Sequence, residues 1–315
     1  MDNILYLVIP CYNEEEVLAE TSARLKKKMY DLIEKNKIDQ KSRVIFVNDG
    51  SGDSTWELIS MLHQQDKLFG GINLSRNRGH QNALLAGLMT VKNYADMVIS
   101  MDADLQDDID AIDEMIDKYS QGIDIVYGVR SSRAKDTFFK KATAEGFYKI
   151  MNSMGANTVF NHADYRLMSK RALEGLSQFE EVNLFLRGIV PMIGYPTDVV
   201  YYERGERFAG ESKYPFGKML SFAIEGITSL STKPIRMITF LGFFIFLVSI
   251  GILIYSLVRH FMGATIVGWT TLMVSVWGIG GLILLSLGVV GEYIGKIYLE
   301  TKARPRYIVE QFLHD

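Results

Sequence analysis

Two carboxylates near the middle of the chain, Asp102 and Asp104, have the types and spacing that metal chemistry needs. They follow a short apolar run at residues 97–101, which is typical of a buried strand. Because alternate side chains of an extended strand point to the same face, we expect both carboxylates on one face at the strand's carboxyl end. Mg²⁺ or Mn²⁺ can be held by one or two carboxylates together with substrate phosphates. A solvated acidic turn is the alternative interpretation, and the elements around the pair must decide between the two.

Four more polar clusters each follow an apolar run in the first 130 residues. The runs are residues 5–9, 44–47, 71–74 and 125–129, and helical patterns separate them. The clusters are Asn13–Glu15, Asp49–Asp53, Arg76–Gln81 and Arg130. Strands that alternate with helices predict an α/β fold with a mainly parallel sheet, in which ligands bind beyond the carboxyl ends of the strands. The five clusters therefore predict one binding site at that edge. Asn13 is also predicted to cap the helix that follows it.

Composition narrows the class of protein. The chain has 315 residues, a formal net charge of −3 and no basic tail, so we expect no nucleic-acid partner. Its single cysteine, Cys11, excludes an internal disulfide and suits a reducing compartment. The start of the chain is not predicted to be a signal peptide. A Gly-x-Gly-x-x-Gly motif after the first strand and a P-loop motif are both missing, which disfavours a dinucleotide-dependent dehydrogenase and a P-loop enzyme.

The C-terminal third differs in character from residues 1–212, which are typical of a soluble domain. Residues 237–258 and 270–290 are apolar and uncharged, and each is long enough to span a bilayer, which takes about 20 residues. Residues 213–236 are predicted to form interfacial amphipathic helices, and residues 293–315 a C-terminal tail. Basic residues flank this predicted two-helix hairpin on both sides: Lys213, Lys218, Lys233, Arg236, Lys296, Lys302, Arg304 and Arg306. The positive-inside rule then places the soluble domain and both termini in the cytoplasm.

Four short motifs occur in order along the soluble domain. They are Val-Ile-Pro-Cys-Tyr-Asn-Glu-Glu at 8–15, Val-Asn-Asp-Gly-Ser-x-Asp at 47–53, Arg-Asn-x-Gly at 76–79 and Asp-Ala-Asp-Leu-Gln-Asp at 102–107. Together they resemble the family 2 glycosyltransferases of GT-A (Rossmann-like) fold. More narrowly, they resemble the polyprenyl-phosphate glycosyltransferases, which include dolichol-phosphate mannose synthase and bacterial undecaprenyl-phosphate sugar transferases.

The resemblance assigns roles to individual residues. Those implied to bind the nucleotide are Pro10, Tyr12, Asn13, Glu14, Asp49, Arg76 and Asp102. Asp102 and Asp104 are implied to hold the metal, and Asp104 and Asp164 to be catalytic. Asp164 lies in Asp-Tyr-Arg-Leu, which is similar to the family's Asp-Phe-Arg-Leu motif. From the residues alone, Asp164 and Arg166 would most often form a structural ion pair. Whether Asp164 acts as a base or orients the acceptor stays open.

A basic segment lies just before the predicted hairpin. The candidates for binding the acceptor phosphate are Arg130, Arg204, Arg207, Ser212 and Lys213. A solvated basic loop is the alternative, but the position next to the membrane favours an anionic lipid headgroup. In the family the corresponding segment is a loop that closes on the phosphates.

The resemblance implies a complete reaction. A UDP-sugar, UDP-N-acetylglucosamine or UDP-glucose, would donate its sugar to undecaprenyl phosphate at the cytoplasmic membrane, with inversion and metal dependence, for cell-envelope glycosylation. The segment Asn-His-Ala-Asp-Tyr-Arg at 161–166 favours a UDP-sugar over the alternative, GDP-mannose, and of the two UDP-sugars we expect UDP-N-acetylglucosamine. A processive polysaccharide synthase would carry a Gln-x-x-Arg-Trp motif, which this chain lacks. A membrane-anchored binding protein without turnover is the alternative from another class. A homo-oligomer and a separate flippase are expected.

Overall fold

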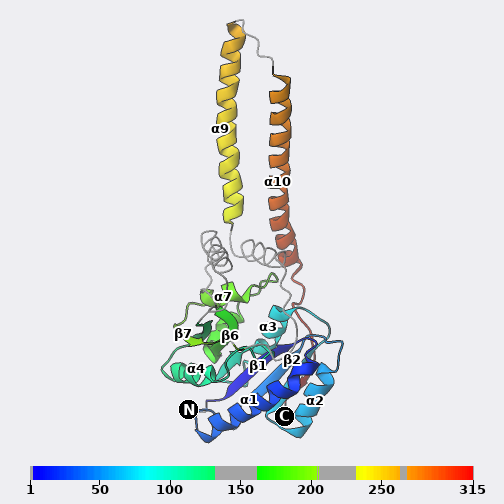
Figure 1. Ribbon diagram of the computed structural model, residues 1–315, viewed down its shortest axis with the longest axis vertical. Coiled ribbons are helices and arrows are strands. Elements are labelled where there is room, and N and C mark those ends of the chain that lie inside the picture. The colour runs from blue at the N-terminus through cyan, green and yellow to red at the C-terminus, as the bar shows by residue number, and fades with distance from the viewer. Residues whose placement is uncertain (1–2, 132–161, 204, 206–231, 263–267, 315) are drawn as a thin grey trace.

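The computed structural model describes residues 3–131, 162–203, 205, 232–262 and 268–314 (Figure 1). The structure has two distinct parts, which are an α/β domain and a pair of long helices that rise from one side of that domain. Four internal segments lie outside the described residues, namely 132–161, 204, 206–231 and 263–267, and most of the predicted interfacial helices at 213–236 fall in the third of them.

An eight-stranded sheet forms the centre of the α/β domain, in the order β7-β5-β6-β4-β1-β2-β3-β8. Its strands are β1 (Leu5–Cys11), β2 (Arg43–Asn48), β3 (Phe69–Leu74), β4 (Met97–Ser100), β5 (Ile125–Arg130), β6 (His162–Ser169), β7 (Thr197–Tyr202) and β8 (Val309–Leu313). The predicted strands of the first 130 residues are all present, and β4, β1, β2 and β3 run parallel. Continuous apolar runs form these strands because both faces of the sheet are covered.

Helices pack on both faces of the sheet. One apolar cluster joins Leu5, Leu7 and Ile9 of β1 to α1 (Glu15–Glu34), α2 (Thr55–Gln65) and α4 (Ala111–Ser120). The other joins Tyr6 and Val8 of the same strand to α3 (His80–Val91), α6 (Lys170–Leu176) and α7 (Leu186–Met192). Alternate residues of β1 thus enter opposite cores, as the period of two in a strand requires. The mainly parallel, doubly covered sheet predicted from the sequence is confirmed.

Strand β6 departs from the parallel pattern, because it lies antiparallel between β4 and β5. Its register pairs Ser100 of β4 with Arg166. Since β6 runs in the opposite direction, its first residues lie at the carboxyl edge of the parallel strands. Asp164 is thereby placed level with the chain that leaves β4 toward Asp102, although about sixty residues separate the two carboxylates in sequence.

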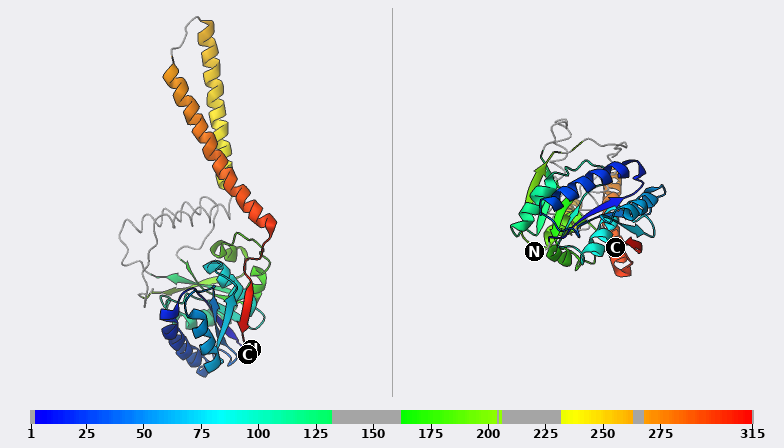
Figure 2. Two further views of the ribbon diagram at one scale, coloured as in Figure 1. Left: turned by 90° about the vertical axis from the view of Figure 1, so that its right-hand side faces the viewer. Right: turned by 90° about the horizontal axis from the view of Figure 1, so that it is seen from below.

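Two long helices follow, α9 (Lys233–Phe261) and α10 (Trp269–Lys302), and they lie side by side (Figure 2). Within them, residues 233–252 and 278–302 are long and apolar enough to cross a membrane, judged by length and composition, and neither stretch is buried. Large apolar side chains such as Phe240 and Leu284 are more than 70% exposed. Helix α10 continues past the predicted end of its apolar stretch and reaches the α/β domain, and the chain then enters the sheet as β8.

Candidate active site

The loops that follow β1 and β2 are bound to each other at the carboxyl edge of the sheet. The backbone N–H of Asn13 donates to Ser51 Oγ at 3.0 Å, and Asn13 Oδ1 accepts from the N–H of Gly52 at 2.9 Å. Asn13 does not cap α1, so that prediction was wrong: its φ is +55°, and Glu14 occupies the N-cap position. The N–H of Glu14 donates instead to Oγ1 of Thr55, the first residue of α2, at 2.9 Å.

Asp49 holds the next loop of the same edge. Its Oδ1 accepts from the N–H of Arg78 at 2.7 Å and its Oδ2 from the N–H of Gly79 at 2.8 Å. Burial raises the pKa of Asp49, although these two hydrogen bonds act in the opposite direction. Gly50 makes the approach of the two loops possible, because a Cβ there would lie 2.5 Å from the backbone nitrogen of Asn77. The side chain of Arg76 is exposed next to this contact.

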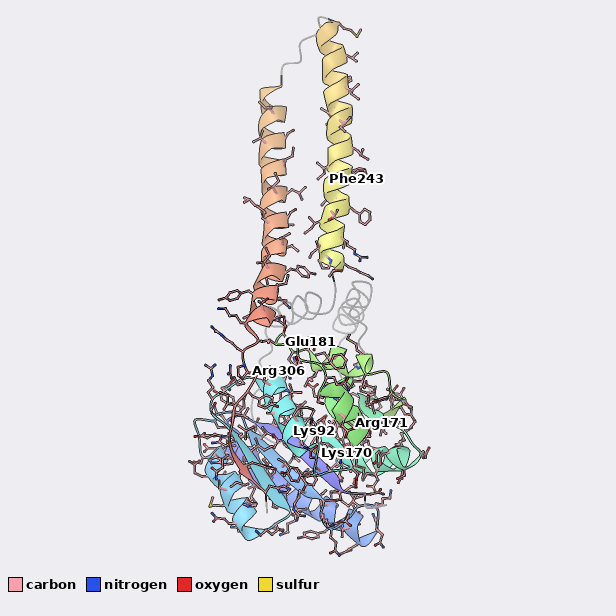
Figure 3. The ribbon with its side chains drawn as sticks, turned by 180° about the vertical axis from the view of Figure 1, so that it is seen from behind. Lys92, Lys170, Arg171, Glu181, Phe243 and Arg306 are labelled. Atoms are coloured by element: carbon pink, nitrogen blue, oxygen red, sulfur yellow. The ribbon has the colours of Figure 1, made fainter. Side chains whose placement is uncertain are left out.

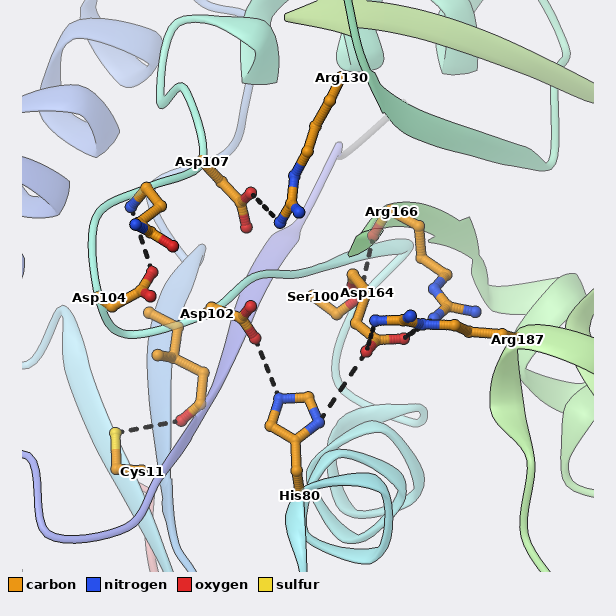
Figure 4. Close-up of polar contacts among 12 residues, drawn as sticks. Cys11, His80, Ser100, Asp102, Asp104, Asp107, Arg130, Asp164, Arg166 and Arg187 are labelled. Carbon is orange, nitrogen blue, oxygen red and sulfur yellow. Dashed lines mark hydrogen bonds and ion pairs between the residues drawn. The ribbon is translucent and has the colours of Figure 1, made fainter. Parts of the chain in front are cut away.

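Asp102 and Asp104 lie on a turn. Strand β4 ends at Ser100, earlier than predicted, and the left-handed φ of +57° at Leu105 shows how tightly the chain reverses. Strand alternation therefore cannot place this pair, and a common face for both carboxylates stays a prediction. Asp104 Oδ1 accepts from the N–H of Gln106 at 3.2 Å, while Asp102 Oδ1 faces His80 Nε2 at 3.0 Å (Figure 4).

Asp164 is held between two arginines. Arg166 Nη2 donates to its Oδ1 at 2.6 Å, and Arg187 Nη2 donates to its Oδ2 at 3.0 Å. Burial favours the neutral carboxyl, but the two guanidinium charges outweigh it and hold the pKa of Asp164 well below its usual range. Arg166 is 1% exposed, so the ion pair between Asp164 and Arg166 that the residue pattern indicated is present and buried. A carboxylate stabilised in this way is a weak base.

His80 connects the two carboxylate groups, a role that the sequence interpretation did not assign. It is the first residue of α3, and its Nδ1 lies 4.0 Å from Asp164 Oδ2 (Figure 4). Burial lowers the pKa of His80, but the hydrogen bond to Asp102 and the charges of Asp102 and Asp164 outweigh it, so the pKa is raised overall. Its position inside the polar cluster 76–81 was the available signal. The sequence assigned no role to Arg187 either.

Asp107 is a further carboxylate, and it is buried beside the turn that carries Asp102 and Asp104. Tyr202 Oη donates to Asp107 Oδ1 at 2.5 Å, and Arg130 Nη2 lies 3.8 Å from the same oxygen. Burial, reinforced by the charge of Asp102, raises the pKa of Asp107 to about 6. Its other oxygen, Oδ2, is buried without a hydrogen-bond partner among the described residues. Arg130, predicted to contact phosphate, is thereby tied to the turn that carries Asp102 and Asp104.

The structure thus brings most of the predicted residues to one edge. Pro10 belongs to β1, Tyr12 and Asn13 follow it, and the side chain of Tyr12 is 50% exposed. Four predicted acceptor-binding residues lie outside the described residues, namely Arg204, Arg207, Ser212 and Lys213.

Comparison with known proteins identifies the family. The profile of Glycosyl transferase family 2 matches residues 6–177, which is more than half of the chain. The chain is a family 2 glycosyltransferase. This glycosyltransferase is 52% identical over 312 residues to the uncharacterized glycosyltransferase YkoT of Bacillus subtilis, a match that covers 99% of this chain and 93% of that protein.

Two further matches concern a phage enzyme and a solved structure. The glycosyltransferase is 39% identical over 309 residues to the bactoprenol glucosyl transferase of Shigella phage SfX, which covers 96% of this chain and 98% of that protein. Among solved structures, glucosyl-3-phosphoglycerate synthase from Mycobacterium tuberculosis aligns with a TM-score of 0.45 and 14% identity, covering 72% of this chain and 79% of that chain.

The carboxylate oxygens of Asp102 and Asp104 are of the kind that binds a hard divalent cation. Glycosyltransferases of GT-A fold commonly use such a metal. Within the described residues, no group of three or more His, Cys, Asp or Glu side chains could hold an ion unaided. Asp102 and Asp104 supply hard oxygen ligands, and the side chain of Asp102 is 38% exposed. An ion bound here would take its remaining ligands from substrate phosphates and water, as Mg²⁺ does.

Proposed function

We propose that this glycosyltransferase transfers a glucosyl residue from UDP-glucose to a polyprenyl phosphate such as undecaprenyl phosphate. The observation that carries the proposal is the match to the bactoprenol glucosyl transferase of Shigella phage SfX, which covers 96% of this chain and so includes both apolar helices. The donor preferred from the sequence alone was weakly UDP-N-acetylglucosamine. Several relatives, which are bactoprenol glucosyl transferases, favour glucose instead.

A membrane location follows from the same proposal. Helices α9 and α10 present exposed apolar side chains, which would be costly in water and are expected in lipid. Their basic flanking residues favour a cytoplasmic α/β domain, with spans at 237–258 and 270–290. The last turns of α10 also contact the site region, because Glu300 accepts from the N–H groups of Val182 and Asn183, just before α7 and Arg187. A lipid-borne phosphate would therefore meet the site close to the membrane surface.

The carboxylates of the turn have a defined task in this proposal. Asp102 and Asp104 would hold Mg²⁺ or Mn²⁺, which supplies positive charge for the departing nucleoside diphosphate. His80 fixes the orientation of Asp102, and the hydrogen bond from the N–H of Gln106 fixes that of Asp104. Asp49 keeps the loop of Arg76 in place, beside the position proposed for the nucleotide.

The acceptor reduces the need for a strong base. A phosphate monoester has a second pKa of roughly 6 and is largely ionised at pH 7. Asp164, held as an anion by Arg166 and Arg187, then acts by orienting Arg187 and the acceptor rather than by removing a proton. We propose direct displacement by the acceptor phosphate oxygen, with inversion at the anomeric carbon. A homo-oligomer and a separate flippase stay predictions.

The experiment uses the full chain purified in detergent, with undecaprenyl phosphate and radiolabelled UDP-glucose, UDP-N-acetylglucosamine or GDP-mannose. Label should enter the lipid phase from UDP-glucose with Mg²⁺ or Mn²⁺, and EDTA should abolish transfer. Asp104→Asn should be inactive, while Asp117→Asn, an exposed carboxylate of α4, should match the wild type. Lipid-linked label from another donor would overturn the glucose assignment. Polymer would indicate a processive synthase, and no transfer from any donor would favour a binding protein.

A further inference from the structure

The chain after α10 returns to the α/β domain and completes the sheet. Strand β8 pairs antiparallel with β3 and forms the edge of the sheet (red in Figure 2). Arg306 Nη1 donates to the backbone oxygen of Phe179 at 3.0 Å, next to Glu181 (Figure 3). Arg78 Nη2 donates to the backbone oxygen of Pro305 at 3.3 Å, so the segment also touches the loop that Asp49 holds.

A bulge in β8 lies beside Asn73 of β3 and leaves one residue of β8 unpaired. Asn73 pairs with Gln311 and Leu74 pairs with Val309, which leaves Glu310 as the extra residue between them. Such bulges change the direction of a side chain and are frequent beside active sites. Glu310 Oε2 accepts from Asn73 Nδ2 at 3.1 Å, across the strand pair.

A chain of hydrogen bonds continues from Asn73 to the site loops. Asn73 Oδ1 accepts from Asn48 Nδ2 at 2.7 Å, and Asn48 Oδ1 accepts from Ser51 Oγ at 2.5 Å. Ser51 Oγ in turn accepts from the N–H of Asn13 at 3.0 Å. These contacts join the loops after β1 and β2 to the C-terminal strand.

Both ends of this series of hydrogen bonds fix its direction. An ionised carboxylate can only accept hydrogen bonds, so Asn73 turns its amide nitrogen toward Glu310. At the other end the backbone N–H of Ser51 also donates to Asn48 Oδ1, at 3.2 Å, so the oxygen of Asn48 faces Ser51 and its nitrogen faces Asn73. With Glu310 removed, the amide nitrogen of Asn73 loses its acceptor in β8, while Asn48 keeps its orientation. Glu310 therefore supports the arrangement of the two amides and ties it to the C-terminal strand.

We propose that the C-terminal strand is part of the donor site, with Glu310 and Asn73 as positioning residues that set the loops after β1 and β2 for the nucleotide. This inference rests on the proposed function in so far as those loops bind the donor. The apolar hairpin and the donor loops are then joined by one continuous segment of chain, from Glu300 at the end of α10 to Glu310 in β8.

The test compares four variants of the full chain: Glu310→Ala, Glu310→Gln, Asn73→Ala and Gln311→Ala. Gln311 is the matched control, because it lies beside Glu310 in β8 with an exposed side chain. We expect Glu310→Ala and Asn73→Ala to raise the KM for the donor about three- to tenfold, the effect of one or two hydrogen bonds, with kcat and the acceptor KM unchanged. Glu310→Gln retains an acceptor oxygen and should restore most of the affinity.

Hydrogen exchange provides a readout that does not depend on the identity of the donor. In Glu310→Ala and Asn73→Ala, amides in residues 11–15 and 48–54 should exchange about threefold faster or more, while those of β8 and β3 keep their protection. Equal exchange in these loops and an equal donor KM for all variants would overturn the proposal and leave β8 as a cover for the sheet edge. Faster loop exchange in a chain that transfers no sugar would uphold the coupling and refute the proposed function alone.

Discussion

His80 Nε2 lies 3.0 Å from Asp102 Oδ1, and its other ring nitrogen lies 4.0 Å from Asp164 Oδ2. One imidazole therefore connects the turn after β4 to the first residues of β6. Neither contact is local in sequence, and both depend on α3 beginning at the carboxyl edge of the sheet.

Replacing His80 tests this connection. His80→Ala should lower kcat/KM about 10- to 100-fold, the usual cost of removing a group that orients a metal-binding side chain. The melting temperature should change little, because the side chain of His80 is 44% exposed. His80→Gln keeps a donor for Asp102 and should lose less activity than His80→Ala. Equal activity of His80→Ala and wild type would show that Asp102 needs no orienting partner.

The buried pair of Asp164 and Arg166 predicts a separation of stability from activity. Asp164→Asn should destabilise the protein by about 3 kcal/mol, because Arg166 keeps its buried charge and loses the carboxylate. In Asp164→Asn/Arg166→Met, thermal unfolding should return most of the way to wild type while sugar transfer stays low. Recovery of transfer together with stability would mean that Asp164 serves the fold and has no role toward substrate.

Asp107 predicts a dependence of stability on pH. Its folded-state pKa of about 6 lies above the ordinary 3.8, so the folded state favours the protonated carboxyl. The free energy of unfolding gained from the protonated Asp107 is fully present below pH 4. It is lost as the pH rises through 6, and the loss amounts to about 3 kcal/mol. Asp107→Asn keeps an acceptor for Tyr202 without the charge. Its melting temperature should exceed that of the wild type at pH 8, and the difference should disappear below pH 4. A constant difference at both pH values would contradict the assignment.

The glycines of the loop after β2 offer a matched pair. Gly50 has a φ of +64°, and a Cβ there would meet the backbone of Arg76 and Asn77, whereas a Cβ on Gly52 would meet nothing within 4 Å. Gly50→Ala should cost about 2 kcal/mol or more and raise the donor KM, because the loops after β2 and β3 must separate. Gly52→Ala should be close to neutral in unfolding and donor-binding measurements. Equal effects of the two substitutions would argue against the close approach.

Local pattern was enough to predict the strands β1 to β5 and the edge at which the site lies. Apolar runs bounded by polar clusters report burial directly, because each run must leave water whatever its partners are. The same reasoning failed at Asn13 and at Asp102, where a few residues of loop decide the geometry. Asn13 is held by a contact with Gly52 in another loop, and Asp102 by a contact with His80 in α3.

The sequence by itself therefore determined the fold class, the family through its ordered motifs, and the apolar character of the C-terminal hairpin. Only the tertiary structure decided that β6 lies antiparallel beside β4 and brings Asp164 to His80, and that β8 completes the sheet and places Glu310 against Asn73. The physical reason is that strand order and register depend on packing between segments far apart in the chain. That packing free energy is summed over the whole core, and no short window of sequence contains it.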